Sequence, residues 1–207
     1  MVGLAWKDAL VVLRDQWKFY AAALAAMMFI PFWDGALGAF PGLLGMLMVF
    51  IPTNACANDT LARWDHFAPC TPAGREGVVA GKYLFALWLS LLGAALLLAY
   101  YPIWCLITGT LAVLPGLLCS AGTCGLIYLL MDALLIPLSF HFGAEKNSLG
   151  ISTLGLPSLF LASGTASAAL GQPNPFSIPF FLALLLAVIF VPLSFQLSAA
   201  LYRRKDL

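Results

Sequence analysis

Apolar stretches long enough to cross a lipid bilayer follow one another along almost the whole chain. About 20 apolar residues are needed for each crossing, and hydropathy predicts six such spans. They cover residues 19–33 (extendable to 37), 39–57, 83–104, 111–140, 149–170 and 178–201. The 207 residues leave room for short connections only, and we expect a polar loop over residues 143–148 between the fourth and fifth spans. We therefore expect an all-α polytopic membrane protein whose residues 1–207 form a single transmembrane domain.

The scarcity of charge excludes several classes of protein. Apolar residues make up 62 % of the chain and charged residues 9 %, whereas an ordinary soluble domain has about 25 % charged residues. A soluble enzyme would need far more polar surface. The formal net charge of +1 gives no basic excess, so we expect no nucleic-acid partner.

The first 18 residues have the pattern of an amphipathic helix and not of a cleavable signal. Apolar side chains, Trp6 and Trp17 among them, recur at helical spacing, while charged residues interrupt the segment. Such a helix lies in the membrane interface, where Trp6 and Trp17 would anchor it at headgroup depth. An ordinary lead-in to the first span remains the alternative.

Lysine and arginine positions predict the orientation. With six spans and both termini on one side, all ten of these residues fall on that side, and the three opposite connections contain none. Loops close to spans keep their positive charge in the cytoplasm. The sequence therefore predicts that both termini are cytoplasmic.

The motifs of familiar catalytic chemistry are missing from the sequence. It has no phosphate-binding GxxxxGK[ST], HExxH or GxSxG pattern and no paired-cysteine zinc spacing. We therefore expect neither catalytic residues nor a metal site. An intramembrane enzyme would have only Ser163 and His141 as a pair, and an ion-coupled secondary transporter only Asp132 as a mid-span ionisable group. Both remain as alternative functions.

The segment 58–82 between the second and third spans is the most informative. A short helix is expected over residues 59–68, with Asp59 or Thr60 as its cap. Pro72 would then begin a new helix, which enters the bilayer near Lys82 and Tyr83. We expect these two side chains to be interface anchors.

Several residues of this segment match a family pattern. They are Asp59, Trp64, Pro72, Arg75, Val78, Lys82 and Tyr83. In this pattern the chain resembles the small permease subunits of bacterial ATP-binding-cassette exporters of the type-two export class. Weaker matches lie at Lys7-Asp8, at residues 143–146 and at Lys205-Asp206. The resemblance is closest to permeases that export phenol-soluble modulins and related cytotoxic peptides, whose relatives serve in lantibiotic self-protection or antimicrobial resistance.

The resemblance implies a subunit of the bacterial cytoplasmic membrane that works with two copies of a separate ATPase, which binds ATP and Mg. It also implies a second permease subunit, identical or different, and a short cytoplasmic coupling helix that docks on the ATPase. The residues expected to couple to the ATPase are Asp59, Arg63, Trp64, Asp65, His66, Phe67, Pro72 and Arg75.

The expected cargo is an amphipathic peptide, because apolar and weakly charged walls suit such a substrate in contact with membrane lipid. Asp132, Ser163 and Ser167 are candidates to line its path, since a charge within a span is expensive and is a functional candidate by default. The hydroxyl groups of the fifth span can instead bond back to their own helix.

Overall fold

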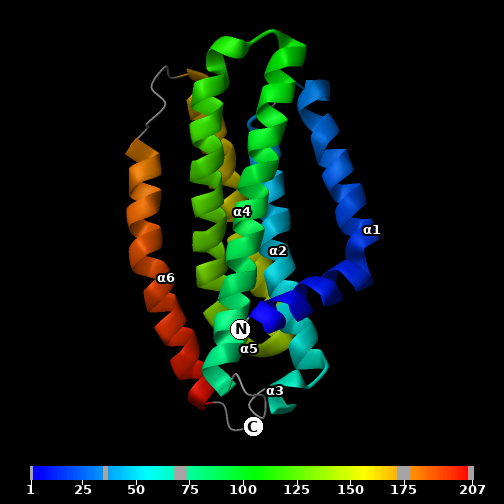
Figure 1. Ribbon diagram of the computed structural model, residues 1–207, viewed down its shortest axis with the longest axis vertical. Coiled ribbons are helices and arrows are strands. Elements are labelled where there is room, and N and C mark those ends of the chain that lie inside the picture. Colours follow the sequence, from blue (N-terminus) through cyan, green and yellow to red (C-terminus); the bar gives the residue numbers. More distant parts are fainter. Residues whose placement is uncertain (1, 35–36, 68–73, 172–177, 205–207) are drawn as a thin grey trace.

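A computed structural model describes residues 2–34, 37–67, 74–171 and 178–204. This part of the chain contains helices and no strand (Figure 1). The elements are α1 (Val2–Asp34), α2 (Ala39–Leu61), α3 (Trp64–Phe67), α4 (Gly74–Thr108), the short 3-10 helix η2 (Leu111–Val113), α5 (Leu114–Gly171) and α6 (Ile178–Arg204). The all-α class expected from the sequence is confirmed.

Helix α2 lies in the middle of the bundle, and α6 lies at its edge. The most apolar window of α2 is 72 % buried, whereas that of α6 is only 17 % buried. The difference is consistent with their packing, because α2 contacts α1, α4 and α5, while α6 contacts α4 and α5. The exposed side of α6 is apolar, with Leu185, Val188 and Leu193 all more than half exposed.

Helix α5 doubles back on itself. As a straight rod its 58 residues would be about 87 Å long. Cys124 Sγ nevertheless lies 3.3 Å from Thr165 Oγ1, a residue 41 positions further along. The two arms of α5 are therefore antiparallel, and they correspond to the fourth and fifth predicted spans. The polar loop expected over residues 143–148 is wrong in detail, because the backbone there is helical.

Helix α1 is bent. Its beginning lies crosswise at one end of the bundle, and the rest rises along the side of α2 and α4 (Figure 1). The start of α1, the end of α6 and helix α3 all lie at this same end, which we call the elbow end. Trp6 is 60 % and Trp17 54 % exposed, so both indoles are available to membrane headgroups. The interfacial role of α1 stays a prediction.

Four helices of the described residues are long and apolar enough to cross a membrane. They are Ala39–Leu61, Gly74–Thr108, Leu111–His141 and Phe180–Tyr202. A shorter apolar helix, Trp17–Phe29, falls within the first predicted span. These findings establish a multi-pass membrane protein. The count of six spans stays a prediction.

Tyr128 of α5 fixes how closely α2, α4 and α5 approach. Its ring lies against Gly45 of α2 and Gly93 of α4, and its hydroxyl donates a hydrogen bond of 2.6 Å to the carbonyl oxygen of Pro41. A Cβ atom at Gly45 would overlap the ring. Glycine is therefore required at position 45 because the tyrosine fills the space that a side chain would occupy.

This packing predicts that Gly45→Ala lowers the melting temperature of the detergent-purified protein by about 5 °C, since overpacking a tight contact costs about 1–3 kcal/mol. Gly164→Ala is the matched control, because nothing lies within 4 Å of a Cβ at that position. Equal melting temperatures for the two variants would contradict the placement of Tyr128.

Candidate functional site

Four charged side chains from three helices form a closed ring at the elbow end. Lys7 Nζ lies 3.0 Å from Asp8 Oδ1 and 2.7 Å from Asp59 Oδ1. Lys82 Nζ lies 2.9 Å from Asp8 Oδ2 and 2.6 Å from Asp59 Oδ2. Each charge thus contacts two opposite charges. We call Lys7, Asp8, Asp59 and Lys82 the four-charge ring; it joins α1, α2 and α4.

The ring is largely shielded from solvent. The side chains of Lys82 and Asp8 are 5 % and 4 % exposed, that of Asp59 15 % and that of Lys7 29 %. Lys82 also donates to the backbone oxygen of Ala55 over 3.3 Å. Removing charges from water is tolerated only when they are paired and hydrogen-bonded. The two positive and two negative charges cancel, so the ring meets that requirement.

Trp64 connects the ring to α3. The ammonium group of Lys7 lies 4.8 Å from the centre of the Trp64 ring, within the range of a cation–π interaction. The chain between α2 and α3 turns sharply at Arg63, which has a φ of 51°, in the left-handed region that is uncommon for residues other than glycine. The turn and the cation–π contact together fix α3 beneath the ring.

The segment formed by the end of α2 and by α3, residues 61–67, presents apolar side chains to the outside. We call this segment the elbow. Leu61 is 75 % and Phe67 66 % exposed, and the side chain of Arg63 is exposed between them. Contiguous exposed apolar groups mark interaction surfaces, and these side chains make the elbow a candidate for one.

Two local expectations for this region are wrong. Asp59 does not cap a new helix, because α2 continues to Leu61; Asp59 lies in its last turn and pairs with two lysines. Lys82 and Tyr83 are only 4 % and 9 % exposed, so they point into the bundle and are not interface anchors. In both cases an ionic or hydrogen-bonding partner on another helix outweighs the local preference.

Tyr83 links α4 to α6. Its hydroxyl lies 2.6 Å from Ser194 Oγ and 2.8 Å from Ser198 Oγ, and Ser194 in turn donates to the backbone oxygen of Ala133 on α5. Lys82 therefore connects α4 to α1 and α2 through charges, and Tyr83 connects it to α6 through hydroxyl groups. Ser194 extends this second link to α5.

The remaining coupling residues are placed as follows. Arg75 is half-buried in the first turn of α4. Pro72 lies outside the described residues. Asp65 and His66 are on α3, and their side chains lie outside the described part.

Asp132 and Ser163 have different environments. Asp132 is 1 % exposed, and neither of its carboxylate oxygens has a hydrogen-bond partner among the described residues. Ser163 donates to the backbone oxygen of Phe160 over 3.0 Å, which agrees with the alternative that hydroxyl groups bond back to their own helix. The side chain of Ser167 lies outside the described part of the chain.

Sequence reasoning did not identify the partners within the site. Lys7 and Asp8 were noted only as a weak match to a family pattern, and Ser194 and Ser198 were not noted. The available signal was charge at the edges of apolar spans, because such a charge requires a partner of opposite sign. Here Lys7 and Asp8, adjacent residues of opposite charge, pair with Asp59 and Lys82 at the edges of later spans.

Long apolar helices, an internally paired ionic site and an exposed elbow are the main features of the described part of the chain. In the comparison with family models, the model of the ABC-2 family transporter protein matches residues 3–203. The chain belongs to this family, and it is a transport component whose family associates with an ABC ATPase. Neither the comparison with curated proteins nor that with solved structures gave a match.

The ring predicts that Lys82→Met destabilises the protein by about 3 kcal/mol, because it leaves two buried carboxylates with one lysine. The double variant Lys82→Met/Asp59→Asn should recover part of the loss, since it restores charge balance. Thermal unfolding in detergent measures both. Leu106→Met is the control, because Leu106 is 69 % exposed and lies far from the ring on α4; additive losses in the double variant would contradict the pairing of Lys82 with Asp59.

Proposed function

We propose that this chain is the permease subunit of an ATP-driven exporter that moves amphipathic peptides out across the bacterial cytoplasmic membrane. The observation that carries the proposal is the elbow, which is exposed at its surface and joined to three helices through the four-charge ring. The family supports the transport role, and the export of peptides rests on the sequence resemblance and the apolar bundle.

The elbow is the surface that docks on the ATPase. Its exposed side chains, Leu61, Arg63 and Phe67, suit a groove with apolar walls and an acidic group. Asp59 and Trp64 act differently from the docking residues, because their contacts are within the chain. They hold the elbow against α1 and α4, so a displacement of the elbow is passed to both helices.

Nucleotide binding drives transport by favouring one arrangement of these helices. A ligand shifts an equilibrium only by its differential affinity for the two states, so ATP must bind more tightly to the ATPase when the elbow is in one position. The continuous helix α4, Gly74–Thr108, extends about 50 Å and carries the movement across the bilayer.

Two permease subunits, identical or different, enclose the path. Half or more of the surface of several large apolar side chains on α6 is exposed, which provides a surface for a second subunit or for lipid. Asp132 is the candidate contact for the peptide, because a buried carboxylate that has no hydrogen-bond partner among the described residues is suited to a cationic side chain of the substrate.

Substitutions at the elbow test the docking role. Arg63→Glu and Phe67→Asp should each lower ATP-dependent efflux of a labelled amphipathic peptide by at least about tenfold, as expected for central residues of an interface. Both side chains are exposed, so the permease should remain folded. The assay uses vesicles that contain the permease and the ATPase subunit of the same system.

Thr110→Glu is the control, because it adds a charge at an exposed position in the connection at the far end of α4. If the elbow variants export as fast as Thr110→Glu and still bind the ATPase, the docking role is wrong.

The role of Asp132 predicts that Asp132→Asn lowers peptide efflux by about tenfold without lowering the melting temperature, because the amide keeps the shape and no ion pair is lost among the described residues. Asp59→Asn should instead lower the melting temperature, since it removes a member of the four-charge ring. Unchanged efflux with Asp132→Asn would remove Asp132 from the substrate path.

A further inference from the structure

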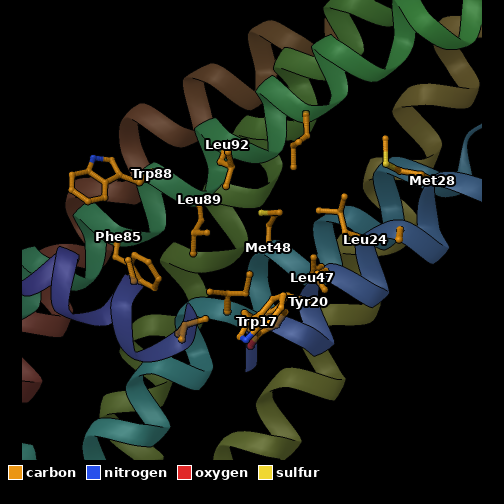
Figure 2. A pocket seen from close by; sticks show the side chains of 16 residues that line it. Trp17, Tyr20, Leu24, Met28, Leu47, Met48, Phe85, Trp88, Leu89 and Leu92 are labelled. Carbon is orange, nitrogen blue, oxygen red and sulfur yellow. The ribbon is translucent and has the colours of Figure 1, made fainter. Parts of the chain in front are cut away.

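An apolar groove lies between α1, α2 and α4, with a cavity volume of about 650 Å³ (Figure 2). Its walls include Trp17, Leu24 and Met28 of α1, Leu47 of α2, and Phe85 and Leu89 of α4. Figure 2 shows these side chains on three facing helices around one space. The groove exists because α1 stands away from α4 at its bend and approaches it again as it rises (Figure 1), where Tyr100 of α4 donates a hydrogen bond of 3.2 Å to the backbone oxygen of Met28.

The chemistry of the walls restricts the occupant to an apolar group. The lining side chains are aliphatic, aromatic or methionine. The hydroxyl group of Tyr20, which also lines the groove, accepts a hydrogen bond of 3.3 Å from Asn54 Nδ2. Polar groups of a ligand would lose their hydration here without finding partners.

The volume restricts the occupant further. A methylene group fills about the same volume as a water molecule, about 30 Å³, so 650 Å³ accommodates on the order of 20 methylene groups. An α-helix about 10 Å across with a rise of 1.5 Å needs about 120 Å³ for each residue. The groove would hold fewer than two turns of a peptide helix, but it holds a complete acyl chain.

Positive charge lies at the groove wall. The ammonium group of Lys18 lies 6.0 Å from the centre of the Trp17 ring, and Trp17 lines the groove. Arg14 precedes Lys18 by four residues and therefore lies on the same side of α1. Both cations are exposed and, unlike Lys7 and Lys82, they are not members of the four-charge ring.

We propose that this groove binds a phospholipid with an anionic headgroup: an acyl chain lies between α1, α2 and α4, and the phosphate lies against Arg14 and Lys18. The proposal does not depend on the peptide substrate or on the ATPase. It assigns the groove to a membrane component that holds α1 in its bent position.

Quenching of tryptophan fluorescence by brominated lipids tests the proposal, because Trp17 and Trp88 both line the groove. The full chain, with its four other tryptophans replaced by phenylalanine so that only Trp17 and Trp88 fluoresce, is reconstituted in phosphatidylcholine vesicles. These vesicles contain a small fraction of phosphatidylglycerol or phosphatidylcholine that has brominated acyl chains. We expect an apparent affinity for the brominated phosphatidylglycerol at least about fivefold higher than for the brominated phosphatidylcholine. In Arg14→Gln/Lys18→Gln this ratio should fall to about one.

Variants that fill the groove with larger side chains provide a second test in the same quenching experiment. Ala21 and Ala25 line it and are exposed, so Ala21→Phe/Ala25→Phe should reduce the selective quenching severalfold without unfolding the protein. Ala22→Phe/Ala26→Phe is the matched control, because these alanines of the same helix are exposed and lie outside the lining.

Three results would overturn the proposal. Equal affinity for the two brominated lipids would show that the headgroup is not recognised. Equal quenching in the filled and control variants would show that lipid binds elsewhere. Protection of Trp17 and Trp88 from both lipids would show that a second subunit or a peptide covers the groove instead.

Discussion

The arrangement of the elbow end depends on a requirement of charge: Asp8 and Lys82 cannot remain buried unless opposite charges meet them. Two adjacent residues of α1, Lys7 and Asp8, satisfy charges on α2 and α4 at the same time. Because both side chains must reach the ring, the rotation of α1 about its axis is fixed as well as its position. A buried ion pair is weak evidence for net stability. It strongly disfavours any arrangement of the helices in which one buried charge lacks its partner. The ring therefore specifies the arrangement of three helices more than it stabilises the bundle.

The course of the helices could be predicted from the sequence, but contacts between distant residues could not. Apolar runs of sufficient length correctly located the start of α2 at Ala39 and of α6 at Ile178, because the lengths of spans follow from bilayer thickness. The polar residues 143–148 suggested a loop, and yet α5 remains helical there while it reverses direction. Its two arms are close enough for Cys124 and Thr165 to be in contact. Hydropathy reports the loss of apolar character at such a position and carries no information on backbone geometry.

Two members of the four-charge ring, Asp59 and Lys82, lie in the segment that the sequence singles out, but their contacts differ from those expected. Aspartate is a good helix cap and lysine extends readily to headgroups, so the expectations for Asp59 and Lys82 followed ordinary local preferences. Their actual partners are distant in the sequence: Lys7 and Asp59 are separated by 52 residues. A single sequence contains no record of which lysine meets which aspartate. The sequence does show that charges of both signs lie at the edges of spans. Which of these charges pair with one another can be worked out only once the helices are placed.

Helix α1 contributes both to the four-charge ring and to the wall of the apolar groove, so the two features are mechanically connected. A lipid in the groove fills the space between α1 and the central helices and favours the arrangement in which α1 lies at its present distance from them. Any movement of the elbow that passes through the ring must move α1 relative to α2 and α4, or else break the ion pairs of Lys7 and Asp8. Because a ligand shifts an equilibrium only by its differential affinity, a lipid that binds one position of α1 more tightly also biases the elbow. With the proposed lipid in the groove and the proposed ATPase on the elbow, both would act on α1, the lipid along the groove wall and the ATPase through Lys7 and Asp8.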